Sequence, residues 1–242
     1  MATPFLSIVI PAYNEERRIG SSLEVVLKYL GDQQYTWEVL VADDGSADGT
    51  ASIVRRKTEG GETRVRLLSL AHRGKGSAVR QGMIAAEGQY RFMADADMAM
   101  PIEQLDDFID HMAEGYDIVI GSRQISGARR HGEPAARHVM GRVFNWAVRL
   151  LAVGGFQDTQ CGFKCFSGDV ADSLFPLQRT DGFGFDAEVL YLAKMRGLRI
   201  MELPIDWYYQ TASKVRPLED TYLMVRDILR VGLRRIRGSY RP

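Results

Sequence analysis

LSIVIPA, residues 6–12, is a short apolar run that predicts a buried β-strand. Apolar residues at three- and four-residue spacing follow between Ile19 and Leu30, which predicts a helix, and WEVLVA at 37–42 predicts a second strand. The alternation continues, with strands expected at 65–70, 90–94 and 116–121 and helices at 51–57, 74–86 and about 101–112. Strands that alternate with helices predict an α/β fold with a mostly parallel sheet covered on both faces.

Polar residues follow four of these strands, at the edge where such sheets bind their ligands. They are Tyr13-Asn14-Glu15, Asp43-Asp44-Gly45-Ser46, Asp95-Ala96-Asp97 and Ser122-Arg123. Because the carboxyl ends of parallel strands meet at one edge, these segments predict a single site.

Composition excludes several classes of protein. The 242 residues carry 31 Lys and Arg against 31 Asp and Glu, and this balance argues against a nucleic-acid binder that relies on bulk positive charge. No stretch is apolar enough for a spanning helix, and the N-terminus does not resemble a signal peptide. Cys161 and Cys165 lack further Cys or His at metal-ligand spacing, so we expect reduced packing thiols and a cytoplasmic protein.

Asp95-Ala96-Asp97 is the most specific of the polar segments. Two carboxylates around one small residue, directly after a strand, can bind Mg²⁺ or Mn²⁺ together with a diphosphate. The alternative is a solvated loop with two acids, and the position at a strand end favours the metal site.

The other segments each have a structural alternative. Asp43 and Asp44 precede a helix, so one of them is expected to cap it and the other to contact a ribose or base. Glu15 is alternatively a first-turn acid that the helix dipole favours. HRGKG at 72–76 lacks the spacing of a P-loop, but Lys75 at a helix start can neutralise part of a nucleotide, unless it is an exposed turn lysine.

The second half of the chain carries two arginine-rich regions. Helices are expected at 135–153, 185–196 and 218–237, and a strand at 198–203. The region from 123 to 149 holds six arginines against Glu133, which suits a second phosphate-bearing substrate or a solvated face. The arginines after 225 suit an anionic membrane surface or a helix packed on its own domain.

Eight motifs occur in one order: PAYNEE, VADDGS, HRGKG, DAD, GSR, DTQCGFK, FDAEVL and the SK at 213–214. Together they resemble the family 2 glycosyltransferases that transfer a sugar from a nucleotide to a polyprenyl phosphate, most closely the dolichyl-phosphate glucosyltransferases. The resemblance covers residues 5 to 216 and implies a nucleotide-sugar-binding, GT-A-like domain over 1–216. A basic amphipathic helix is expected over 217–242.

The resemblance also implies site residues. Those expected to bind the nucleotide are Pro11, Ala12, Tyr13, Glu15, Asp43, Asp44, Lys75, Asp95 and Ala96. Those expected to bind the acceptor phosphate are Arg123, Arg129, Arg130, Gln160 and Lys214. Asp158 and Asp186 fall in motifs that line the family's active site. Asp95 and Asp97, as the metal pair, and Arg123 are the expected catalytic residues.

The expected reaction is an inverting, metal-dependent transfer of a hexose, with glucose from UDP favoured, to a polyprenyl or dolichyl phosphate. A phosphate monoester is largely dianionic at neutral pH, so it needs placement by arginine and no general base. The alternatives are a mannosyltransferase that uses GDP-mannose, transfer to a protein or polysaccharide hydroxyl, and a non-catalytic nucleotide-sugar-binding module.

Two features depart from the family's pattern. Mannosyltransferase relatives often carry a glutamine where this chain has Ala99. Many relatives also carry transmembrane helices, which this sequence lacks. We therefore expect peripheral attachment to the membrane surface, either direct or through an anchoring partner protein.

Overall fold

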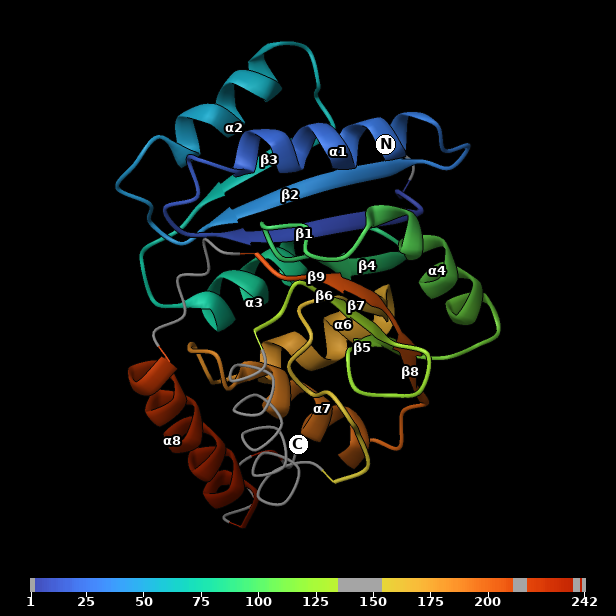
Figure 1. The fold of residues 1–242 in the computed structure, drawn as a ribbon, viewed down its shortest axis with the longest axis vertical. Coiled ribbons are helices and arrows are strands. Elements are labelled where there is room, and N and C mark those ends of the chain that lie inside the picture. Colours follow the sequence, from blue (N-terminus) through green and yellow to red (C-terminus); the bar gives the residue numbers. More distant parts are fainter. Residues whose placement is uncertain (1–2, 135–153, 211–216, 237–239, 241–242) are drawn as a thin grey trace.

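A seven-stranded sheet forms the centre of the protein (Figure 1). The computed structural model describes residues 3–134, 154–210, 217–236 and 240. The expected helix at 135–153 lies outside these residues. In spatial order the strands are β3 (Val65–Ser69), β2 (Trp37–Asp43), β1 (Leu6–Ala12), β4 (Tyr90–Met93), β7 (Lys164–Ser167), β5 (Ile118–Ser122) and β8 (Ile200–Pro204).

All neighbouring strands of this sheet run parallel except β7, which is antiparallel to both β4 and β5. Lys164, the first residue of β7, pairs with Met93 at the end of β4. The chain before β7 therefore lies at the edge where the parallel strands end. The predicted mostly parallel sheet is confirmed, while β7 was not predicted.

Helices cover both faces of the sheet (Figure 1). One face packs against α1 (Ile19–Gly31), α2 (Thr50–Glu59) and α4 (Leu105–Ala113), which follows the 3₁₀ turn η1 (Ile102–Gln104). The other packs against α3 (Lys75–Ala85), α6 (Gly168–Leu174) and α7 (Phe185–Met195), with the 3₁₀ turn η2 (Phe175–Leu177) between the last two. Ile8 and Ile10 of β1 pack in the first layer and Val9 in the second, which explains why these apolar residues are consecutive and do not alternate with polar ones.

Two further elements complete the described structure. A small parallel pair consists of β6 (Arg129–His131) and β9 (Asp206–Tyr208). The long helix α8 (Pro217–Ile236) lies outside α7, and Val231 and Asp227 are among its buried side chains. None of the helices in the described ranges is both long and apolar enough to cross a membrane.

Candidate functional site

A cavity of about 850 Å³ opens at the carboxyl ends of β1, β2 and β4. It is lined by residues that follow these strands, by residues 72–75 before and at the start of α3, by the loop at 179–183, and by α8. Nine predicted site residues come together here: Pro11, Ala12, Tyr13, Glu15, Asp44, Lys75, Asp95, Ala96 and Asp97.

An aromatic pair forms one wall of the cavity. The rings of Tyr13 and His72 stack with centroids 4.1 Å apart and an interplanar angle of 15°. His72 Nδ1 lies 2.8 Å from Asp44 Oδ2. The Asp44 carboxylate also accepts two backbone N–H groups, that of Arg73 on Oδ1 at 2.9 Å and that of Gly74 on Oδ2 at 2.8 Å. Asp44 therefore fixes residues 72–74, and this loop in turn holds the ring against Tyr13.

Asp43 differs from Asp44 in its surroundings. Its side chain is only 3% exposed, does not line the cavity, and accepts hydrogen bonds from the hydroxyl and the backbone N–H of Ser46. Ser46 in turn accepts the backbone N–H of Asn14 at 2.8 Å. Asp43 thus ties the turn after β2 to the turn after β1.

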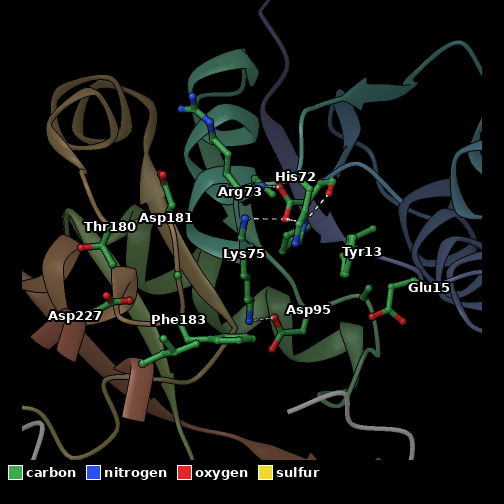
Figure 2. Close-up of a pocket in the computed structure, with 18 of the residues that line it drawn as sticks. Tyr13, Glu15, His72, Arg73, Lys75, Asp95, Thr180, Asp181, Phe183 and Asp227 are labelled. Atoms are coloured by element: carbon green, nitrogen blue, oxygen red, sulfur yellow. Dashed lines mark hydrogen bonds and ion pairs between the residues drawn. The ribbon is translucent and has the colours of Figure 1, made fainter. Parts of the chain in front are cut away.

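The acid pair, Asp95 and Asp97, follows β4 and faces the cavity. Lys75 Nζ lies 2.5 Å from Asp95 Oδ1, and Figure 2 shows the lysine reaching from α3 towards this carboxylate. Gly162, just before β7, packs so closely on Asp95 that a Cβ there would overlap the carboxylate. Asp97 accepts the backbone N–H of Ala99 at 3.2 Å.

The charges around the acid pair shift its protonation. Burial opposes ionisation of Asp95, but the charge and hydrogen bond of Lys75 hold its pKa below the ordinary value. Burial and the like charge of Asp95 raise the pKa of Asp97. Burial alone would lower the pKa of Lys75, yet the charges of Asp95 and Asp186 outweigh it and raise that pKa. The two acids thus repel one another, and a further cation between them would relieve that repulsion.

Further charges lie beside and beneath the acid pair. Glu15 forms an ion pair with Arg18 at the cavity wall. The buried Lys164 donates to Asp186 at 2.5 Å and to the carbonyl of Cys161. Burial raises the pKa of Asp186 in spite of Lys164. Asp95 thus lies within a network of opposite charges that includes Lys75, Lys164 and Asp186.

The acceptor arginines expected from the sequence lie outside the cavity lining. Arg123 makes a bidentate ion pair with Asp158, at 2.7 and 3.0 Å, and Asp158 is 1% exposed. Arg130 pairs with Glu133 at 2.7 Å, and Arg129 is exposed. Gln160 follows Asp158 in the loop before β7, and its backbone N–H donates to Asp158 at 3.3 Å. Lys214 lies outside the described residues.

Sequence reasoning missed one side of the cavity. Arg179, Thr180, Asp181, Gly182 and Phe183 line it, and α8 adds Leu223, Arg226, Asp227, Arg230 and Arg234. The labelled residues of this group lie across the cavity from Tyr13 and Glu15 (Figure 2). The amphipathic pattern predicted a basic helix here, with the arginines after residue 225 on its polar face. It did not show that this face meets the cavity.

The side chains fit a hard divalent cation only in part. Among the described residues no group of three or more His, Cys, Asp and Glu side chains is placed to hold a metal. The acid pair supplies carboxylate oxygens, the donors that Mg²⁺ and Mn²⁺ prefer, and such ions commonly complete their coordination with water and substrate phosphate. A metal here would therefore depend on a bound phosphate-bearing ligand.

Known proteins resemble this chain at the level of sequence. The sequence profile described as Glycosyl transferase family 2 matches residues 7–169. The dolichyl-phosphate beta-glucosyltransferase of Drosophila melanogaster is 36% identical, over 98% of this chain and 77% of that protein. The human protein of the same name is 34% identical, over 99% of this chain and 78% of that protein.

Solved structures share the fold. Glucosyl-3-phosphoglycerate synthase from Mycobacterium tuberculosis, solved with UDP, gives a TM-score of 0.68 at 22% identity, covering 96% of this chain and 80% of that one. Mannosyl-3-phosphoglycerate synthase from Rubrobacter xylanophilus gives a TM-score of 0.72 at 19% identity, covering 99% of this chain and 76% of that one. The fold is thus the GT-A fold that the resemblance predicted. From the profile match and the extent of identity, the chain belongs to glycosyltransferase family 2.

Proposed function

We propose that this protein transfers glucose from UDP-glucose to a polyprenyl phosphate such as dolichyl phosphate, with inversion at C1. The observation that carries the proposal is the cavity, which joins an aromatic wall, a lysine and two carboxylates at the ends of β1, β2 and β4. The names of the relatives, which match nearly the whole chain at 34–36% identity, support glucose and dolichyl phosphate as the substrates.

The donor would occupy the part of the cavity between Tyr13 and the acid pair. Tyr13, supported by His72, offers a flat surface for a base, and stacking on an aromatic side chain stabilises a bound base by about 1–3 kcal/mol. Lys75 and Arg18 supply positive charge beside the position proposed for the diphosphate. The proposed nucleotide site also includes Pro11, Ala12, Glu15, Asp44 and Ala96 in the cavity wall, and Asp43, which supports it from outside the lining by holding the turns after β1 and β2.

Asp95 and Asp97 are the residues proposed to hold Mg²⁺ or Mn²⁺. Such an ion supplies positive charge that stabilises the leaving diphosphate. The glucosyl-3-phosphoglycerate synthase of Mycobacterium tuberculosis was solved with Mn²⁺ and UDP, which supports a divalent ion in this fold. Lys75 donates to Asp95 Oδ1 at 2.5 Å and so holds this carboxylate in place.

The acceptor needs to be positioned more than activated. Its phosphate already carries most of its negative charge at neutral pH, so the attacking oxygen needs no general base. We assign its placement to Arg123, Arg129, Arg130, Gln160 and Lys214. Because Arg123 is paired with Asp158, a phosphate would share this guanidinium with the buried carboxylate or compete for it.

We further propose that the protein binds the cytoplasmic surface of the membrane peripherally. On α8, Leu229 and Leu233 are 50% and 51% exposed, next to Arg226 and Arg230. Exposed leucines beside arginines suit an anionic lipid surface. Flotation with vesicles of anionic lipid at low salt tests this directly. If the vesicles float without the protein, direct attachment is contradicted, and attachment through an anchoring partner protein is the remaining possibility.

The test of the reaction uses purified protein, UDP-glucose, Mn²⁺ or Mg²⁺, and a short polyprenyl phosphate. The expected product is a lipid-linked glucose in β configuration. Asp97→Asn should abolish most turnover, while the matched change of the exposed Asp107→Asn should not. Comparing transfer from UDP-glucose with transfer from GDP-mannose distinguishes a glucosyltransferase from the mannosyltransferase alternative. Tight nucleotide binding without transfer from any donor would overturn the proposed reaction.

A further inference from the structure

Glu188 on α7 is a carboxylate with 0% exposure whose two oxygens are both occupied. Oε2 accepts the backbone N–H groups of Arg179 at 3.0 Å and Thr180 at 2.7 Å. Oε1 accepts the hydroxyl of Tyr240 at 2.5 Å and the guanidinium of Arg234 at 3.2 Å. One buried side chain thus connects α7 to three other parts of the chain.

Two of these parts form one wall of the cavity. The 179–183 loop and α8 both line it, and they touch each other through Asp227. A Cβ at Gly182 or Gly184 would overlap the Asp227 side chain, so the loop lies directly against the helix. Figure 2 shows Thr180, Asp181, Phe183 and Asp227 together on this side. Movement of the loop or of α8 would therefore reshape the same wall.

The loop also rests on the start of α3, which carries Lys75. The carbonyl of Asp181 accepts the backbone N–H of Ser77 at 3.1 Å, and Gln178 Nε2 donates to the carbonyl of Gly76 at 2.8 Å. A Cβ at Gly76 would overlap the carbonyls of Thr180 and Gly182. The backbone that Glu188 fixes is thus in direct contact with the residue after Lys75.

The protonation of the partners supports a stable junction. Burial and the hydrogen bond to Glu188 raise the pKa of Tyr240, so its phenol keeps the proton that it donates. Arg234 supplies the positive charge that a buried carboxylate requires. With four donors, the junction satisfies the carboxylate on both oxygens, as buried ionised groups require.

We propose that Glu188 is a positioning residue for glycosyl transfer, which holds the 179–183 loop against α3 and α8 and so sets the place of Lys75 beside the donor diphosphate. The effect on transfer rests on the proposed function, whereas the effect on the loop does not. Small displacements of positioning groups reduce rates strongly, by as much as about 10²-fold for 1 Å.

Another buried glutamate provides the matched control. Glu38 on β2 is 6% exposed and accepts a backbone N–H from Glu87 at 2.7 Å, a hydroxyl from Ser7 at 2.6 Å and the guanidinium of Arg66 at 2.8 Å. These are the same three kinds of donor that Glu188 has, and Glu38 does not line the cavity. Glu38→Gln and Glu188→Gln should therefore cost similar stability while differing at the site.

The first measurement is hydrogen exchange on the full chain without substrate. Glu188→Gln places an NH₂ group against donors, so we expect faster exchange over residues 179–184 and at the start of α3. In Glu188→Gln, the exchange rates of β1 and β2 should change no more than they do in Glu38→Gln. Unchanged protection of the loop in Glu188→Gln would overturn the proposal, whatever the reaction of the wild-type protein.

The second measurement is steady-state transfer. We expect Glu188→Gln to raise the KM for UDP-glucose about tenfold at temperatures where it is fully folded, and Glu38→Gln to leave KM unchanged. If Glu188→Gln does not fold, Tyr240→Phe removes one donor only and should raise KM about threefold. Equal KM values in all folded variants would overturn the link to the donor. A wild-type protein without transferase activity would instead refute the proposed function and leave the exchange result standing.

Discussion

Replacing Arg123 by methionine tests whether this arginine supports the fold or acts on the acceptor. Arg123 Nε and Nη2 lie 2.7 and 3.0 Å from the two oxygens of Asp158, and the two side chains are 23% and 1% exposed. Removing one partner of such a buried pair costs about 3–5 kcal/mol of unfolding free energy. Asp158 would keep backbone N–H donors from residue 123 at 3.1 Å and from Gln160 at 3.3 Å, so we expect about 3 kcal/mol.

Urea unfolding at pH 7, read from the midpoint at constant m-value, measures this cost. The double variant Arg123→Met with Asp158→Asn buries a neutral amide in place of an unpaired carboxylate. It should recover about 2 kcal/mol of the lost unfolding free energy, and a double-mutant cycle measures this recovery as the coupling between the two side chains. The matched exposed change Arg55→Met should cost less than about 0.5 kcal/mol.

The penalty should also depend on pH. In the wild-type protein burial opposes ionisation of Asp158, but Arg123 holds its pKa below the ordinary value, so its stabilisation is present at neutral pH and lost only as pH falls below about 4. Without Arg123 the pKa of Asp158 rises, so the penalty of the single variant should shrink as pH falls from 7 towards 5. A cost below about 1 kcal/mol that does not vary with pH would refute the structural role. Loss of transfer at unchanged stability would then assign Arg123 to the acceptor.

Three further perturbations test the site. Gly162→Ala should lower kcat at least about tenfold, since its Cβ overlaps the first carboxylate of the acid pair, whereas Gly31→Ala, which meets nothing within 4 Å, should retain wild-type turnover. Tyr13→Ala should raise the KM for UDP-glucose about tenfold because the stacking surface for the base is lost. The control Tyr208→Ala removes a comparable exposed tyrosine that stacks on a histidine, and it should leave this KM unchanged. Equal KM values in the two variants would contradict a role of the aromatic wall in donor binding. Burial raises the pKa of the Cys161 thiol to about 12, so a thiol reagent at pH 8 should label it only after denaturation, and rapid labelling of the folded protein would show an open site.

The centre of the sheet was predictable from sequence because strands such as β1 and β2 are buried along their whole length. Such strands are mostly apolar, and the strands expected at 6–12, 37–42 and 90–94 correspond to β1, β2 and β4. The convergence of Tyr13, Asp44 and Asp95 followed from a general property of parallel sheets and needed no contact information. Local pattern and topology together were sufficient for this half of the cavity.

The other half depends on packing that no local pattern encodes. The 179–183 loop carries no strand or helix signal, and it reaches the cavity because glycines at 76 and 182 allow close approach of distant segments. The amphipathic pattern placed the arginines after residue 225 on the polar face of a helix, but a membrane surface and the protein's own domain were both compatible with that pattern. The orientation of α8 is set by its tertiary contacts: Arg234 pairs with the buried Glu188, and Asp227 packs against Gly182 and Gly184.

The antiparallel strand β7 has a consequence for the order of folding. The strands β3, β2, β1 and β4 are contiguous in space and come from the first 93 residues, so this half of the sheet can form as soon as that segment is available. β7 then inserts between β4 and β5, and only its arrival brings Gly162 against Asp95. Pairings over long sequence separations form slowly because loop closure costs entropy before contacts repay it. We therefore expect the acid pair to acquire its final surroundings in the last folding phase, so that regain of activity lags behind regain of secondary structure.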